Sequence, residues 1–175
     1  MFQTSKLRRR KRNVKSRLSN VIHQFLKIWV AFCRVGTVSL TFVTSKMKSR
    51  DYVQVLNEHL LPFVEARRDQ PLVFQHDNAS IHVSAETSRF LQDKNICVLD
   101  WPACSPDLNP IENVWGNMVR QVYVENKQYA LIAQLKAAIL DVWRKLDLQT
   151  LKNHVDSMPN CMLEIVQSKG NAINY

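Results

Sequence analysis

Two acidic residues are the first candidates for chemistry in this sequence. Asp77 lies in the stretch QHDNASIH, which comes directly after the apolar run 72–74. Between Asp77 and Glu112 there are 34 residues. An aspartate that ends a strand can present its carboxylate at the edge of a sheet, beside a second carboxylate from another element. Carboxylate oxygens are hard ligands that suit Mg²⁺ or Mn²⁺. Two such ions held close together would support the cleavage or joining of phosphodiester bonds.

Polar residues beside each carboxylate are the next candidates. His82 could touch a phosphate or orient a ligand, and Asn78 and Asn109 are candidate substrate or supporting residues. Each acid also has an ordinary structural explanation, because Asp77 with Asn78 is typical of an Asx-turn and Glu112 stands where a capping-box acid would. His82 could likewise serve only as a hydrogen-bond partner in a loop. Spacing alone leaves these alternatives open, since an acidic pair without a third ligand is a weak metal motif.

Alternating strands and helices must position these residues. The pattern of apolar residues and turn signals predicts a hairpin around Gly36 and two further strands, the last of them buried: 28–33, 37–43, 72–75 and 96–99. Helices are predicted between the strands, at 51–66 and after Ser84, and throughout the C-terminal third: 129–146, 148–157 and 159–168. This order of elements is typical of an α/β layer structure.

The helix that carries Glu112 has the clearest signals. Asn109 is its expected N-cap and Pro110 its first residue. Its apolar residues recur at helical spacing and predict an inward-facing stripe: Ile111, Val114, Trp115, Met118 and Val122. Trp115 is therefore an expected core residue.

Positive charge is concentrated at the start of the chain. The formal net charge is +9, and residues 1–17 contain eight of the 24 Lys and Arg residues and none of the 15 acids. We expect residues 1–27 to be an unstructured basic tail and residues 28–175 to form one domain. The longest apolar stretch, 28–43, contains Arg34 and is shorter than the ~20 apolar residues that span a bilayer, so no membrane association is expected.

The centre of this basic tail has several potential roles. It could bind phosphates without reading sequence, direct nuclear import, form part of a transit peptide or have no role. The residues concerned are Arg8, Arg9, Arg10, Lys11 and Arg12.

Three stretches of the sequence together form a specific pattern: VFQHDNASIHVS, ICVLDWPACSPDLNPIENVWG and the ending VDSMP to NAINY. They resemble the catalytic domain of Tc1/mariner-type transposases, nearest to the Tc3-like branch. The block SPDLNPIENVWG is the most specific part of this resemblance. The similarity runs from about Trp29 to Tyr175 and is looser at its start, where Val30 stands in place of the family's usual Gly.

This resemblance implies an RNase H-like fold and a site of three carboxylates with two Mg²⁺ or Mn²⁺ ions. The implied activity is DNA strand cleavage and transfer at transposon ends. Asp77 matches the family's second acid and Glu112 its third, with the family's spacing between them. The first acid would fall before residue 1. The acids that precede Asp77 are not credible replacements, because they lie on the predicted helix 51–66 or its exit loop: Asp51, Glu58, Glu65 and Asp69.

The resemblance also implies a truncated domain. The strand expected to be missing is the first strand of the domain, which is the central one of its sheet. We expect a transposase-derived protein of the DDE superfamily, located in the nucleus and catalytically impaired. DNA binding should be weak and non-specific, through the basic tail, because phosphate contacts position a protein without specifying sequence. A homodimer is a further expectation. The alternatives are an active nuclease that takes its first acid from a partner chain or an unexpected residue, and a non-enzymatic nuclear DNA-binding module that uses the tail.

Overall fold

The structure is a computed structural model and describes residues 2–4, 26–44, 46–101 and 108–168. The basic run at 8–12, residues 102–107 of the proline-containing loop and the ending 169–175 lie outside this part of the chain. Among the described residues, no helix combines the length and the apolar character needed to cross a membrane.

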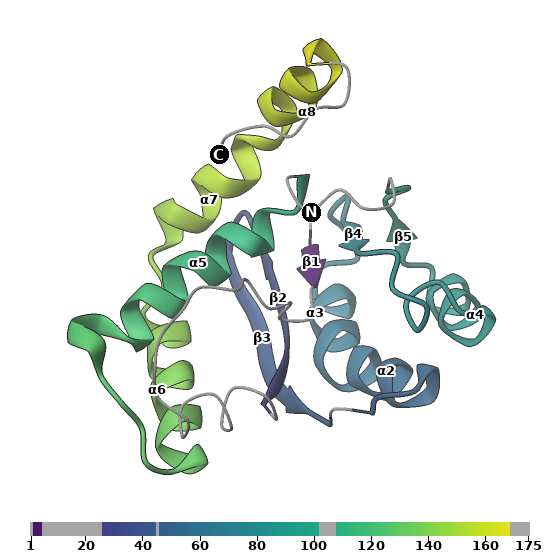
Figure 1. The fold of residues 1–175 in the computed structure, drawn as a ribbon. Coiled ribbons are helices and arrows are strands. Elements are labelled where there is room, and N and C mark those ends of the chain that lie inside the picture. Colours follow the sequence, from purple (N-terminus) through teal and green to yellow (C-terminus); the bar gives the residue numbers. More distant parts are fainter. Residues whose placement is uncertain (1, 5–25, 45, 102–107, 169–175) are drawn as a thin grey trace.

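One five-stranded sheet organises the described chain (Figure 1). β2 runs antiparallel to both of its neighbours, whereas β1, β4 and β5 run parallel to one another. In the order in which they lie side by side, the strands are β3 (Gly36–Val43), β2 (Lys27–Cys33), β1 (Phe2–Thr4), β4 (Val73–His76) and β5 (Cys97–Val98). The mixture of strands and helices confirms the predicted α/β class.

The central strand β1 corrects the prediction for the start of the chain. The sequence predicts an unstructured tail over residues 1–27 and a missing central strand, but Phe2–Thr4 occupy the central position and Lys27 already begins β2. In β1, Gln3 pairs with Phe32 of β2 on one side and with Gln75 of β4 on the other. Three residues are too few to show the alternation that identifies a strand in a sequence. Only the pairing with two neighbours reveals this one.

The predicted hairpin is present, and its first strand faces two cores. Arg34 and Val35 form the turn, and Gly36, paired with Cys33, has a φ of 136°, which few other residues adopt readily. Successive side chains of a strand point to opposite faces of a sheet. Accordingly, one set of β2 residues packs in each core: Ile28, Val30 and Phe32 in the first, and Trp29, Ala31 and Cys33 in the second.

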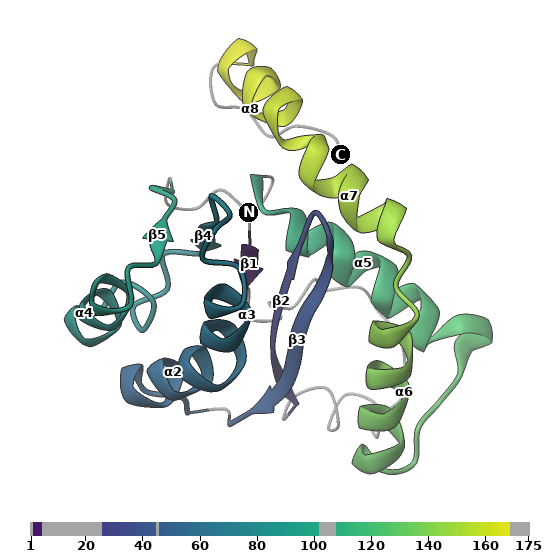
Figure 2. The same cartoon turned by 180° about the vertical axis from the view of Figure 1, so that it is seen from behind.

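Helices cover both faces of the sheet (Figures 1 and 2). The second core lies under α2 (Ser49–Val55), the π-helical segment η1 (Leu56–Leu60), α3 (Leu61–Glu65) and α4 (Ala85–Asp93). The first core lies under α5 (Pro110–Val122), α6 (Ile132–Arg144) and α7 (Leu148–Asp156). The short 3-10 helix η3 (Val124–Asn126) follows α5, and α8 (Met158–Gln167) extends beyond the sheet in both views.

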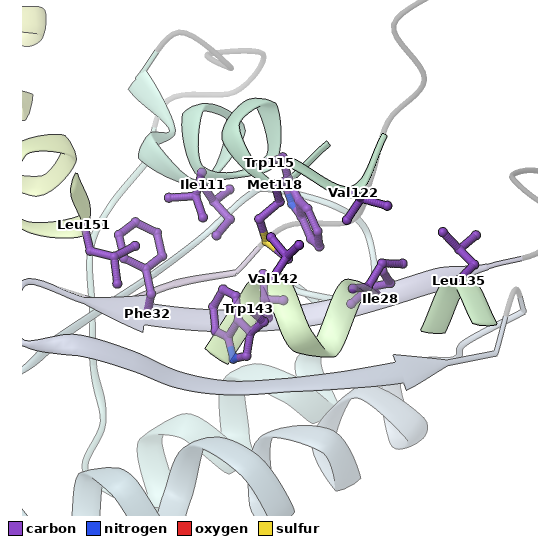
Figure 3. Close-up of a cluster of buried hydrophobic side chains, with 13 residues drawn as sticks. Ile28, Phe32, Ile111, Trp115, Met118, Val122, Leu135, Val142, Trp143 and Leu151 are labelled. Atoms are coloured by element: carbon purple, nitrogen blue, oxygen red, sulfur yellow. The ribbon is translucent and has the colours of Figure 1, made fainter. Parts of the chain in front are cut away.

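The first core contains the whole predicted stripe of α5 (Figure 3). Its members are all buried, and Trp115 is 6% exposed. Opposite them stand Ile28 and Phe32 of β2, together with residues of α6 and α7: Leu135, Ile139, Val142, Trp143 and Leu151.

Two elements differ in detail from their predictions. The helix predicted at 51–66 runs from Ser49 to Glu65 but switches to π spacing at Leu56–Leu60, so that Pro62 falls near the start of α3, where a missing N–H is tolerated. The strand predicted at 96–99 is shorter, Cys97–Val98, and the prediction of its burial is correct for Ile96, which is buried just before it, but wrong for Cys97 and Val98, which are exposed. β5 is the outer strand of the sheet and has a neighbour on one side only.

Candidate metal site

Asp77 directly follows β4 and is held through one of its two carboxylate oxygens. Oδ1 accepts a hydrogen bond from the backbone N–H of Ala79 at 3.0 Å, which is the predicted Asx-turn, and lies 2.6 Å from Nδ1 of His82. Oδ2 accepts no hydrogen bond from the described residues, and the side chain is 42% exposed. The carboxylate therefore has one anchored oxygen and one that is open to a ligand.

Three aromatic rings stand behind this carboxylate. His82 packs against Tyr52 of α2 at 4.2 Å between ring centroids and against His76 of β4 at 5.2 Å, the latter pair almost parallel. The hydroxyl of Tyr52 lies 3.2 Å from Nδ1 of His76, within hydrogen-bonding distance. All three residues are buried. Asp77 thus sits at the boundary between a buried aromatic group and the surface.

This environment lowers the pKa of both Asp77 and His76. Burial favours the neutral form of Asp77, but the hydrogen bond and attraction from His82, together with the Ala79 N–H, outweigh it, so the pKa of Asp77 falls below its ordinary value. Burial, reinforced by His82 and opposed by Asp77, lowers the pKa of His76 to about 4. At neutral pH the site therefore presents a charged carboxylate beside a neutral imidazole.

Asn78 connects the end of β4 to the loop that leads to α5. Its Nδ2 donates a hydrogen bond to the backbone oxygen of Trp101 at 2.6 Å. Trp101 is buried with Leu108 against Met158 and Cys161 of α8. The segment after Asp77 is therefore tied to Trp101, which in turn packs with Leu108 just before α5.

Glu112 lies in the first turn of α5 and is exposed. Its backbone N–H donates to the carbonyl of Asn109 at 3.0 Å, and the positive end of the helix dipole favours a carboxylate here. Asn109 is the N-cap by position, as predicted, but its side chain makes no capping hydrogen bond. Its Oδ1 is buried without a partner among the described residues.

The structure brings some of the predicted residues together directly and others only through shared elements. Asp77 and His82 are in contact. Glu112 stands on α5, which packs against β1, and β1 is the strand beside β4. No group of three or more His, Cys, Asp or Glu side chains that could hold a metal ion occurs among the described residues. The open oxygen of Asp77 fits Mg²⁺ or Mn²⁺ by its chemistry, but a third carboxylate ligand is lacking in this part of the chain.

Two residues of the site were not singled out from the sequence. Tyr52 reads as one apolar position of an amphipathic helix, and His76 as the last residue of a strand. Their contact with His82 depends on how α2 packs against β4. The only local signal is the adjacency of His76 to Asp77, which by itself does not predict a buried, neutral imidazole.

Comparisons with known proteins show the family to which the chain is similar. Residues 9–136 match the family model of DDE superfamily endonucleases. The chain is 46% identical over 148 residues to the transposable element Tc3 transposase of Caenorhabditis elegans, an alignment that covers 85% of this chain and 45% of that protein. It is 28% identical over 148 residues to the Tcb2 transposase of Caenorhabditis briggsae, covering 85% and 54%. The chain therefore spans about half the length of the curated relatives it matches.

Solved structures give the same result for the fold. The catalytic domain of Mos1 transposase, solved with raltegravir and Mn, superposes with a TM-score of 0.80 at 17% identity, over 99% of this chain and 84% of that chain. A Mos1 paired-end complex with the left transposon end superposes with a TM-score of 0.81, also at 17% identity, over 99% and 56%. These matches confirm the predicted RNase H-like fold.

Proposed function

This chain belongs to the DDE superfamily of endonucleases, as a transposase-derived domain of Tc1/mariner type, and we propose that it binds DNA and a divalent cation but is impaired in strand cleavage and transfer. Asp77 and Glu112 are the proposed metal ligands and the remaining catalytic acids. The observation that carries the cation site is the Asp77 carboxylate, with Oδ1 anchored and Oδ2 open at the end of β4. A bound Mg²⁺ or Mn²⁺ would polarise a phosphodiester and lower the pKa of a bound water.

The composition of β1 supports the proposed impairment. The family resemblance places its first acid on the central strand, and here the central strand is Phe2–Thr4, with the sequence Phe-Gln-Thr. None of these three residues carries a carboxylate. With two carboxylates instead of three, a pair of ions would be under-coordinated, so we expect weak cation binding and little or no strand cleavage.

Melting curves with and without millimolar Mn²⁺ test the cation site. A ligand that binds only the folded state raises the melting temperature, so we expect Mn²⁺ to raise it in the parent chain and to have no such effect on Asp77→Asn. Asp93→Asn makes the same chemical change at an exposed position at the end of α4 and should keep the rise. A parent chain whose melting is indifferent to Mn²⁺ would exclude the proposed site.

Nicking of supercoiled plasmid in Mn²⁺ tests the impairment separately. We expect little or no nicking by a chain that nevertheless melts cooperatively. Sustained nicking that is lost in Asp77→Asn would contradict the proposal and would favour an active nuclease with an acid supplied from elsewhere.

We further propose that the basic run contacts DNA phosphates, without sequence preference, in the nucleus. A homodimer belongs to the same proposal. Each phosphate contact changes the slope of log affinity against log salt by about 0.9. Replacing the run by glutamine should therefore reduce that slope by up to about 4.5, as measured by fluorescence anisotropy with duplex DNA. The run comprises Arg8, Arg9, Arg10, Lys11 and Arg12.

A matched control separates the tail from the acidic site. Glu112→Gln should leave the salt slope unchanged, because its carboxylate is not a phosphate-binding group. Substitution keeps Phe2–Thr4 in place, whereas deletion of residues 1–17 would also remove β1. An unchanged slope after all five substitutions would show that DNA binding depends on other residues.

A further inference from the structure

We propose that His82 is a positioning residue for Asp77, which holds Oδ1 by a hydrogen bond so that Oδ2 is presented to the cation. The inference rests on the proposed function, because it assumes that Asp77 binds a metal. It assigns His82 a role inside the protein instead of a direct contact with substrate. The buried side chain, with 1% of its surface exposed, favours this role over contact with a DNA phosphate.

The hydrogen-bond geometry requires Nδ1 of His82 to be the donor. Nδ1 lies 2.6 Å from Oδ1 of Asp77 and 3.1 Å from the backbone oxygen of the same residue. Both of these oxygens are acceptors, since an aspartate with an ordinary pKa is ionised at neutral pH and a backbone carbonyl has no proton to donate. The proton between His82 and Asp77 must therefore reside on Nδ1, and one N–H serves both oxygens.

The surrounding rings fix the orientation of this donor. Tyr52 and His76 pack against His82 at centroid distances of 4.2 and 5.2 Å, and the ring planes of the two histidines differ by only 5°. The second ring nitrogen, Nε2, is buried without a hydrogen-bond partner among the described residues. Among the described residues, the orientation of the His82 ring is therefore set by the packing of Tyr52 and His76 and by the contact of Nδ1 with Asp77. This is the geometry of a group that orients its neighbour.

A second anchor on the same oxygen completes the arrangement. The Ala79 N–H also donates to Oδ1, so two donors hold one oxygen of Asp77. A carboxylate held in this way cannot rotate without breaking both bonds. Oδ2 then keeps one direction before any ion arrives, which lowers the entropic cost of binding.

Three substitutions of His82 separate the hydrogen bond from ring packing. His82→Phe keeps a ring of similar size and removes the donor. His82→Asn removes the ring, but its amide nitrogen branches from Cγ as Nδ1 does and can still reach Oδ1. His82→Gln carries the same amide one carbon further away and lacks a donor at that position.

Titration with Mn²⁺ alone, by calorimetry on chains shown to melt cooperatively, provides the readout. Loss of a residue that orients a metal ligand typically weakens metal affinity by about 10–100-fold. We expect that loss for His82→Phe and His82→Gln, with His82→Asn remaining close to the parent. A His82→Phe chain with parental affinity, or equal losses in all three variants, would overturn the inference and leave His82 as a packing residue.

A metal-free measurement distinguishes this failure from that of the proposed function. If His82 and Asp77 are coupled, the double variant His82→Phe with Asp77→Asn should lower the melting temperature by less than the sum of the two single variants. Additive losses would show that no hydrogen bond links the pair, and would overturn the inference even if the parent binds Mn²⁺. A parent chain that binds no Mn²⁺ would overturn the proposed function together with this inference.

Discussion

At the scale of single residues, the unusual feature is a neutral histidine beside a charged aspartate. His76 is 6% exposed and shares its surroundings with Tyr52, Phe74 and His82. Few polar groups there can stabilise an imidazolium, so burial dominates over the attraction of Asp77 and lowers the pKa of His76 to about 4. The same burial keeps the imidazole of His76 uncharged at neutral pH.

The free energy of unfolding should therefore fall as the pH is lowered from about 6.5 towards 4. In the unfolded chain a histidine has a pKa near 6.5, so the unfolded state takes up the proton first. The contribution of neutral His76 is fully present above pH ~6.5 and is lost as the pH falls towards its folded pKa, by up to ~3 kcal/mol. Urea unfolding at several pH values between 7.5 and 4 measures this loss.

His76→Gln is the control for this titration, because it removes the ionisable ring and keeps a polar side chain. Burial also lowers the pKa of His154, which acts in the same direction. If the pH dependence of His76→Gln matches that of the parent, His76 does not carry the effect, and His154 becomes the next candidate.

At the scale of elements, α5 combines the candidate acid with the main core contact. Glu112 lies exposed in its first turn, while Trp115 and Met118 further along the helix are buried against β2. A small apolar cavity of about 60 Å³ borders Trp115 and is also lined by residues of β2 and α6. Any loss of packing under α5 would therefore also affect the helix end on which Glu112 stands.

Trp115→Ala should lower the free energy of unfolding by ~3–5 kcal/mol, because it removes a buried ring and enlarges an existing cavity. Val119→Ala on the same helix is the control, since Val119 is 44% exposed and its truncation should cost within about 0.5 kcal/mol. Chemical denaturation of both variants gives the comparison. Equal, small effects would mean that α5 does not pack through Trp115.

At the scale of the whole molecule, three residues join two halves of the sheet. In the strand order β3–β2–β1–β4–β5, β1 is the only strand among the described residues that neighbours both the hairpin and the β4–β5 pair. The two halves are also linked by packing, because Trp29 of β2 and Phe74 of β4 share the second core. The tip of the hairpin is held elsewhere, since the guanidinium of Arg34 binds Asp156 of α7 at 2.6 and 3.0 Å, and such an exposed ion pair contributes little stability. The hydrogen-bonded continuity of the sheet therefore depends on β1.

Gln3→Pro should disrupt the sheet at its centre. Proline lacks the N–H that a central strand donates, and it is found essentially only in edge strands or bulges. We expect a broad melting transition, or none, in place of a cooperative one, and loss of any Mn²⁺ response, because β1 lies beside the strand that ends at Asp77. Gln3→Val keeps the donor and favours a strand, so it should melt like the parent. Cooperative melting of Gln3→Pro would show that β1 is dispensable.

The sequence was sufficient to predict the elements that have a local signature. The helix from Pro110 follows from its cap, its proline and its apolar stripe, and the hairpin follows from two β-branched runs around Gly36. The family pattern around Asp77 and Glu112 indicated the RNase H-like fold, which the Mos1 superpositions confirm. The metal-binding role of these acids remains a prediction. The π segment at Leu56–Leu60 and the exposure of β5 were not predictable, because both depend on neighbouring elements.

The sequence by itself determined most of the helices and strands, which of their faces are apolar and which acids belong to the family pattern, because each of these has a signature within a few neighbouring residues. Only the tertiary structure decided that Phe2–Thr4 is the central strand, since a three-residue strand has no period of its own and is defined by pairing with β2 and β4. It alone decided that His82 faces Asp77 with Tyr52 and His76 packed behind it. Those contacts join residues from different elements, and the packing of α2 against the end of β4 sets their distances.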